Sequence, residues 1–95
     1  PVLVIVTSTD DDDAARLANA TKFGLGASVW SADREAGLAL GRRIESGALF
    51  VNGIVASDPR LPFGGIKHSG YGRELSAEGL REFTNQRTYW VGDLA

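Results

Sequence analysis

Short apolar runs alternate along this chain with segments in which apolar residues recur at helical spacing. The first run, residues 2–6, is continuous and mostly β-branched, which is typical of a strand that is covered on both faces. Three further runs predict short strands at residues 27–30, 48–51 and 88–91. Helical segments separate these runs, so the order of elements indicates an α/β fold with mainly parallel strand pairing.

Two helices are predicted in the first half of the chain. Thr9 and Asp12 have the spacing of a capping box, and the helix that they start is expected to reach about residue 22. Ser31 is expected to cap a second helix of about thirteen residues. In that helix, Gly37 and Gly41 form a flat strip that another element could approach closely.

A long loop is predicted from Asn52 to about Leu75, before a third helix that starts at Ser76. Leu75 and Leu80 have the spacing of a hydrophobic staple around that start. A loop of this length in so small a chain is more often functional than idle. It contains the glycine-rich segment 61–74, in which specific polar residues stand among the glycines.

Composition narrows the classes of protein. A chain of 95 residues suits one small domain. Its net charge of -2 argues against a nucleic-acid partner, which normally meets a basic patch. No apolar run approaches the roughly 20 residues that span a bilayer, and the N-terminus lacks the basic region of a signal peptide. There is no cysteine, so disulfides are excluded.

Two segments have some features of a ligand site, one for a metal ion and one for a phosphate group. The acidic run 10–13 lacks the alternating acids and sixth-position glycine of an EF-hand loop, and a helix start accounts for it, so no metal site is predicted. Residues 65–70 have the glycine spacing of a phosphate-binding loop, but Tyr71 and Gly72 stand where Lys and Ser or Thr are required. Leu75 takes the place of the third glycine in a dinucleotide fingerprint.

The remaining polar residues of the segment do not form a complete catalytic set. His68 is the only histidine, and a lone loop histidine is most often a solvated side chain. Ser69 is beside it in sequence, but adjacent residues rarely meet in the geometry that a serine nucleophile needs. Arg73 and Glu74, beside a glycine turn, are interpreted as a structural tie.

The pattern Pro-Phe-Gly-Gly-x-Lys-x-Ser-Gly-x-Gly-Arg-Glu at residues 62–74 resembles the aldehyde dehydrogenase superfamily near the C-terminal end of its catalytic domain. Further matches to family motifs lie at residues 1–2, 17–27, 47–52 and 83–91. The resemblance implies that the chain is the last portion of a much longer enzyme, here called the parent enzyme. Residues 1–85 would complete its catalytic domain, and residues 86–95 would form an oligomerisation strand and tail.

The family oxidises aldehydes to acids with NAD or NADP, using a cysteine thiolate and a glutamate-activated water. The thiolate, the base and the cofactor domain would all lie upstream of this chain, which has no cysteine. The resemblance also implies that the parent enzyme is cytoplasmic and that its substrate is a small aldehyde. The chain alone is expected to be inactive and to bind no cofactor, and in the parent it would supply the far wall of the active site.

Residues 55–63 are similar to family members described as succinate-semialdehyde dehydrogenases. Ser57 and Phe63 stand where the family places side chains that contact the substrate. By this resemblance, Ser57 would help to hold the distal carboxylate of the semialdehyde. Arg60 is the alternative partner for that carboxylate, since a guanidinium binds a carboxylate better than a hydroxyl does.

The resemblance also assigns supporting roles. Glu74 would assist proton relay near the catalytic base, Arg73 would tie the active site toward the subunit interface, and Asn52 would be structural. Arg87 and Tyr89 belong to a final strand that would pair with a neighbouring subunit, which implies a homo-oligomer. No residue of the chain is expected to be catalytic itself.

Two other hypotheses remain open at this stage. The chain could be a short natural protein that uses the same fold only for association, or an α/β scaffold whose loop binds a small anion. The sequence that the gene encodes upstream of Pro1 would discriminate between these two hypotheses and the fragment hypothesis. An upstream segment that encodes the cysteine and the glutamate favours the fragment, and a start near Pro1 favours the association module.

Overall fold

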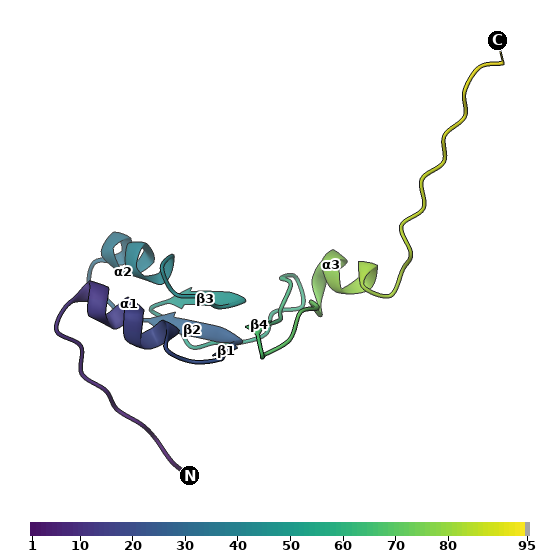
Figure 1. Ribbon diagram of the computed structural model, residues 1–95. Helices are drawn as coiled ribbons and strands as arrows, with labels where there is room; N and C mark the ends of the chain where they lie inside the picture. Colours follow the sequence, from purple (N-terminus) through teal and green to yellow (C-terminus); the bar gives the residue numbers. More distant parts are fainter. Residues whose placement is uncertain (95) are drawn as a thin grey trace.

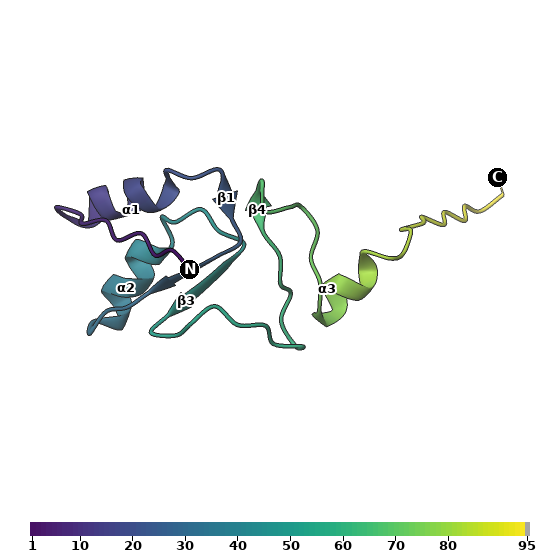
Figure 2. The same ribbon diagram turned by 90° about the horizontal axis from the view of Figure 1, so that it is seen from below.

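The computed structural model describes residues 1–94, which form a small α/β body with an extended segment at each end (Figures 1 and 2). Residue 95, the last of the predicted tail, lies outside the described residues. The elements in chain order are α1 (Asp11–Asn19), β1 (Phe23–Gly24), β2 (Gly26–Val29), α2 (Arg34–Gly41), β3 (Ala48–Val51), β4 (Ile66–Lys67) and α3 (Ser76–Arg81).

The strands form two pairs of opposite sense. β2 and β3 pair in parallel, from Gly26 opposite Ala48 to Val29 opposite Val51, with α2 as the connection that parallel strands require. β1 and β4 pair antiparallel, because the long loop after β3 turns back and brings β4 beside β1. The prediction of mainly parallel pairing is therefore right for the β2–β3 unit only, and the loop predicted from Asn52 to Leu75 is interrupted by β4.

α2 packs on the β2–β3 pair through its glycine strip (Figure 1). A Cβ atom at Gly41 would lie 2.6 Å from Leu49 Cδ2, and one at Gly37 would lie 3.2 Å from Val51 Cγ1. Both contacts are closer than ordinary side-chain packing allows, so the absence of a Cβ lets the helix meet β3 directly. The prediction of a close approach at this strip is confirmed.

Both predicted caps in the first half of the chain are shifted. α1 is capped by Asp10, whose Oδ1 accepts from the N–H of Asp13 at 2.8 Å, and not by Thr9. α2 is capped by Asp33, whose carboxylate accepts from two backbone N–H groups, and not by Ser31. In each case an aspartate nearer the helix was the competing cap, since Asp caps at least as well as Ser or Thr. Each helix therefore begins after its predicted start, and each also ends before its predicted end, α1 at Asn19 and α2 at Gly41.

α3 begins at Ser76, as predicted. Leu75 precedes it with a φ of 65°, in the left-handed region, and provides no side-chain cap. The Ser76 hydroxyl accepts from the N–H of Glu78 at 3.3 Å. Leu80 is 75% exposed, so the predicted hydrophobic staple does not bury it.

The strands predicted at residues 2–6 and 88–91 do not form among the described residues. Both segments are extended but lack a strand partner, and they leave the body in different directions (Figures 1 and 2). Val2 is 94% exposed and Trp90 is 90% exposed. These predictions were wrong for this chain because an apolar run gives the propensity for a strand, whereas a strand requires a neighbour that accepts its hydrogen bonds.

The body buries little apolar surface. Ala15 and Val29 are the hydrophobic residues that are buried within residues 1–94. The accessible surface is 8030 Å², whereas a compact chain of 10.1 kDa exposes about 5,300 Å². The Cα radius of gyration is 18.6 Å, against about 12 Å for a compact domain of this length. The described chain therefore leaves much of its apolar surface without cover.

Candidate functional site

The glycine-rich segment 61–74 forms a closed loop. Phe63 and Glu74 pair across its base as an isolated antiparallel bridge, with both N–H to O distances at 2.8 Å. Just inside this bridge, Arg73 Nη1 donates to the carbonyl oxygens of Gly65 at 2.9 Å and of Gly72 at 2.8 Å. The predicted structural tie at Arg73 is present, and it is made to backbone carbonyls of the loop.

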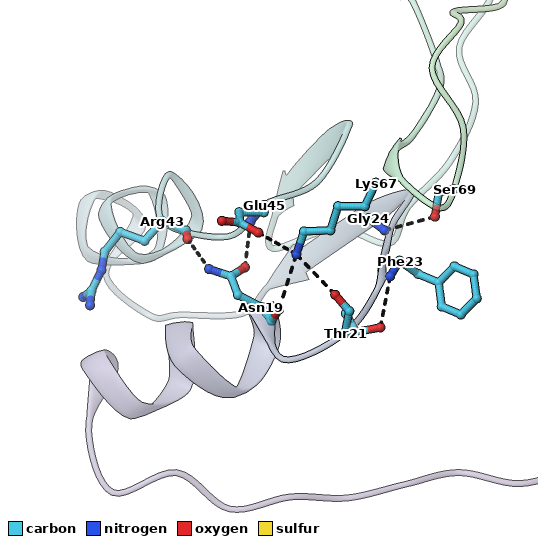
Figure 3. Close-up of polar contacts among 8 residues, drawn as sticks. All are labelled: Asn19, Thr21, Phe23, Gly24, Arg43, Glu45, Lys67 and Ser69. Carbon is cyan, nitrogen blue, oxygen red and sulfur yellow. Dashed lines mark hydrogen bonds and ion pairs between the residues drawn. The ribbon is translucent and has the colours of Figure 1, made fainter.

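The tip of the loop is anchored to β1 and to the end of α1. Lys67 lies in β4, and its ammonium group points at the carbonyl oxygens of Asn19 and Thr21, both at 3.3 Å (Figure 3). The same ammonium pairs with Glu45 Oε2 at 2.5 Å. Nearby, Ser69 Oγ accepts from the N–H of Gly24 at 3.0 Å.

Asn19 joins this anchor to the residues that follow α2. Its Nδ2 donates to the carbonyl oxygen of Arg43 and its Oδ1 accepts from the N–H of Glu45, both at 2.8 Å (Figure 3). Sequence reasoning identified Asn19 and Lys67 only as letters of a motif and did not mention Glu45 at all. The signal that could have found this contact is Asn19 itself, a polar residue near the end of a predicted helix, where backbone carbonyl groups lack partners within the helix.

Several N–H groups near the tip of the loop donate to carbonyl oxygens within the protein. His68 donates to the carbonyl oxygen of Lys22 at 2.9 Å, and Ser69 donates to that of Ile66 at 3.1 Å. The His68 ring meets the Phe23 ring edge-on, with 6.5 Å between centroids. These backbone donors therefore do not converge on an open position, as a phosphate-binding loop requires.

Two grooves border the closed loop, and Phe63 lines both. One groove, of about 370 Å³, lies between the loop and the residues that follow α3, and it includes Arg73, Glu74 and Phe83. The other, of about 280 Å³, lies against β3 and includes Phe50 and Leu61. The structure thus brings together three predicted site residues: Phe63, Arg73 and Glu74.

Ser57 and Arg60 lie outside both grooves, in the exposed part of the long loop. Arg60 is already paired, because its Nε and Nη2 donate to the two carboxylate oxygens of Asp58 at 2.9 and 2.6 Å. These hydrogen bonds lower the pKa of the Asp58 carboxyl and raise the pKa of the Arg60 guanidinium. The charge of the Arg60 guanidinium is therefore partly neutralised by Asp58, which weakens its attraction for any other carboxylate.

The other predicted residues lie away from the grooves. Asn52 directly follows β3 and binds the backbone of Ser31 through its side-chain amide. Arg87 lies in the extended C-terminal segment, with its guanidinium 4.7 Å from the centre of the Tyr89 ring, and Tyr89 is 75% exposed. The structure does not test the interface role predicted for these two residues.

Residues 1–94 contain no group of three or more His, Asp or Glu side chains arranged to hold a metal ion. Within the same residues, no helix has the length and apolar character needed to cross a membrane. The arrangement thus consists of a closed loop, an aromatic residue that lines two grooves, and a carboxylate and a guanidinium at the base of the loop.

Comparison with known proteins identifies this arrangement. The model of the aldehyde dehydrogenase family matches residues 1–89. Succinate-semialdehyde dehydrogenase (NADP+) 1 of Mycobacterium ulcerans (strain Agy99) is 50% identical over 97% of this chain. The chain spans 20% of the length of that relative.

Solved structures agree with the sequence match. The succinic semialdehyde dehydrogenase of Streptococcus pyogenes, in complex with NADP+, is 42% identical and superposes with a TM-score of 0.83 over 88% of this chain and 18% of its own. An aldehyde dehydrogenase of Mycobacterium tuberculosis, complexed with NAD+, is 41% identical with a TM-score of 0.77, over 82% of this chain and 16% of its own. Sequence and fold together show that this chain belongs to the aldehyde dehydrogenase family.

Proposed function

We propose that the chain is the C-terminal part of the catalytic domain of a parent enzyme that oxidises succinic semialdehyde to succinate. The observation that carries this proposal is the 50% identity to a succinate-semialdehyde dehydrogenase over nearly the whole chain. The match covers 97% of this chain and therefore extends over the loop from β3 to α3, a kind of segment that varies more readily than a packed core does. A match over nearly the whole chain supports a shared substrate better than one short motif would.

In this proposal the chain shapes the aldehyde site and does not perform the chemistry. Phe63 would contact the carbon chain of the aldehyde, since it lies between two grooves at the base of the closed loop. Glu74 is fixed beside it by the backbone bridge and would stand near the reacting groups as a proton-relay residue. The nucleophile and the general base would come from residues of the parent enzyme outside this chain.

The glycine-rich loop and α3 do not fit a dinucleotide cofactor. A dinucleotide site requires backbone N–H groups that point at the pyrophosphate, usually at a helix N-terminus. Here the N–H groups of His68 and Ser69 donate to carbonyl oxygens of the chain, and α3 has only six residues. NAD or NADP would therefore be held by other parts of the parent enzyme.

Ser57 is the residue proposed to hydrogen-bond the distal carboxylate of the substrate. Its hydroxyl makes no hydrogen bond with residues 1–94, whereas Arg60 is occupied by Asp58. A hydroxyl that donates to a carboxylate forms a charge-assisted hydrogen bond, which is stronger than a neutral one. The exposed position of Ser57 requires that the rest of the parent enzyme close over this loop.

The domain and assembly assignments are part of the same proposal. Residues 1–85 would complete the catalytic domain, and residues 86–95 would pair with a neighbouring subunit of a cytoplasmic homo-oligomer. Arg87 and Tyr89, which contact each other in the extended segment, would belong to that interface. The exposure of the segment supports the proposal, because an unpaired strand edge favours pairing with another chain.

The test compares the parent enzyme, expressed from the whole gene, with the 95-residue chain alone. Each is assayed with succinic semialdehyde and with butanal, in the presence of NAD or of NADP. The parent is expected to prefer succinic semialdehyde, and the isolated chain is expected to show no turnover above the blank. A parent with no preference for the semialdehyde would refute the substrate assignment, and a gene that starts near Pro1 would favour the association module.

A further inference from the structure

We infer that Lys67 is a positioning residue of the aldehyde site, because its ammonium group fixes the closed loop that carries Phe63 and Glu74. The inference rests on the proposed function for what the loop faces. The anchoring itself rests on contacts within this chain. Lys67 touches neither groove, and its effect would reach the site through the loop backbone.

The surroundings of Lys67 match the bonding capacity of its ammonium group. A protonated lysine has three N–H donors, and here three oxygen atoms receive them: two backbone carbonyl oxygens and Glu45 Oε2. One carbonyl belongs to Asn19, the last residue of α1, where the helix dipole favours a positive charge, and the other belongs to Thr21, just beyond the cap. A neutral side chain would leave this set of acceptors without a cation.

The contact differs from an ordinary surface ion pair. The Lys67 side chain is 24% exposed, whereas the Glu45 side chain is 57% exposed. An exposed pair alone contributes little to stability. In this case the lysine also binds the Asn19 carbonyl oxygen, which the end of the helix leaves without a partner, and the Thr21 carbonyl oxygen beyond it. The two carbonyls and not the carboxylate are therefore expected to dominate.

The backbone of Lys67 supports a positioning role. Its φ of 54° lies in the left-handed region, which a lysine rarely adopts. Such a conformation persists only where surrounding contacts determine it, and it recurs at sites where geometry matters. Lys67 pairs with Phe23 in the β1–β4 ladder, so its backbone and its side chain are both held from the same direction.

The loop backbone connects the fixed position of Lys67 to the groove residues Phe63 and Glu74 over a short distance in sequence. Six residues lie between Lys67 and Glu74, and Arg73 holds this part of the loop by donating to the carbonyl oxygens of Gly65 and Gly72. The bridge between Phe63 and Glu74 then joins the two ends of the loop. A displacement of the tip at Lys67 is therefore carried to both groove residues together.

The experiment uses the parent enzyme with four variants: Lys67→Met, Lys67→Arg, Glu45→Gln and Lys22→Met. Lys22→Met is the matched control, since it removes a neighbouring positive charge whose contact within residues 1–94 is with the Phe23 ring, at 5.5 Å from its centre. Two quantities are measured well below the unfolding temperature. They are the hydrogen-exchange rates of peptides that cover residues 63–74, and the kcat and KM for the aldehyde.

Lys67→Met is expected to raise KM for the aldehyde about tenfold and to speed exchange in residues 63–74 by a similar factor, on the scale of one charge-assisted hydrogen bond. The KM for the cofactor should not change. Lys67→Arg should restore most of the aldehyde KM, because it keeps the charge. Glu45→Gln should have a smaller effect, and Lys22→Met should have none.

The inference is overturned if Lys67→Met leaves the exchange of residues 63–74 at the wild-type rate. It is also overturned if exchange is faster but KM for the aldehyde is unchanged, because the loop would then be anchored without positioning substrate. A parent enzyme that oxidises a different aldehyde refutes the substrate assignment alone, and the variants are then compared with that aldehyde. If no aldehyde is oxidised, the proposed function fails and the exchange rates alone decide whether Lys67 anchors the loop.

Discussion

Asn52 binds both backbone polar groups of Ser31 with its side-chain amide. Its Oδ1 accepts from the N–H of Ser31 and its Nδ2 donates to the carbonyl oxygen of Ser31, both at 2.8 Å. The backbone N–H of Asn52 donates to Val29, at the end of the β2–β3 ladder. The side chain thus imitates one more residue of parallel pairing after β3 ends, and it fixes the chain that leads into α2.

We expect Asn52→Ala to lower the free energy of unfolding of the parent enzyme by about 1–3 kcal/mol, which is the sum of two ordinary hydrogen bonds. Asn52 also has a φ of 55°, which alanine tolerates poorly. Asn52→Gly is the control, because glycine adopts this φ without strain while it lacks the amide. Denaturant unfolding measures both. If the glycine variant is as stable as the wild type, the amide contacts contribute nothing.

The close contact between Gly47 and Gly64 gives a second prediction. A Cβ atom at Gly47 would overlap the carbonyl oxygen of Gly64 and would lie 3.0 Å from Gly65 Cα. All of these neighbours are backbone atoms, so they cannot rotate away. Gly47→Ala should therefore displace the base of the glycine-rich loop and cost about 1–3 kcal/mol or more, as other overpacked sites do.

Gly53→Ala is the matched control for this prediction. Gly53 also lies in the segment around β3, but a Cβ atom there would meet nothing within 4 Å. We expect this variant to be neutral or slightly more stable. Thermal unfolding of the parent enzyme compares the two substitutions. Equal midpoints for both variants would show that the contact at Gly47 relaxes without cost.

Local patterns in the sequence predicted the elements whose partners are near in the chain. β3 occupies residues 48–51 as predicted, α3 starts at Ser76, and the strip of Gly37 and Gly41 meets β3. The family was predicted from motif residues, and the comparisons confirm it. In each case the signal is carried by a few neighbouring residues or by a motif.

Contacts between distant segments were not predictable in the same way. Lys67 contacts Asn19 across 48 residues, and nothing in the local sequence of either residue indicates the other. β1 and β4 have two residues each, so neither gives an apolar pattern long enough to detect. Residues 2–6 failed for the opposite reason, because their pattern is strong but the strand requires a neighbour that residues 1–94 do not supply.

Substrate choice in the parent enzyme distinguishes Ser57 from Arg60. If Ser57 binds the distal carboxylate, Ser57→Ala loses a charge-assisted hydrogen bond of roughly 1.5–3 kcal/mol, or about 10- to 150-fold in kcat/KM. This loss should appear with succinic semialdehyde and not with butanal. Arg60→Ala should change both substrates little, because Asp58 already holds the guanidinium.

Asp58→Asn completes this comparison, since it weakens the hold on Arg60. If Arg60 were the true partner of the carboxylate, the Asp58→Asn variant would favour succinic semialdehyde more strongly than the wild type does. A selective loss in Arg60→Ala would assign the role to Arg60. Equal losses on both aldehydes in every variant would mean that the loop shapes the site without reading charge.

The pair of Asp58 and Arg60 also has a signature in its titration. Hydrogen bonds from Arg60 lower the pKa of Asp58 below its ordinary value of 3.8. A group with a lowered pKa stabilises the folded form above its ordinary pKa, and this contribution is lost as pH falls through the lowered value. NMR titration of the carboxyl carbon should give a pKa below 3.8, and Arg60→Met should return it toward 3.8. An identical pKa in both proteins would show that the pair does not persist in solution.

We finally expect the isolated 95-residue chain to self-associate. Residues 2–6 and 89–91 are apolar and exposed, and each segment is extended with its backbone hydrogen-bonding groups unpaired by another strand. Extended apolar edges of this kind pair with other chains. Sedimentation at high micromolar concentration should show species larger than a monomer. Val4→Lys combined with Trp90→Lys should shift the distribution toward monomer, because charged side chains on an edge oppose pairing. A clean monomer of the unmodified chain would contradict the prediction.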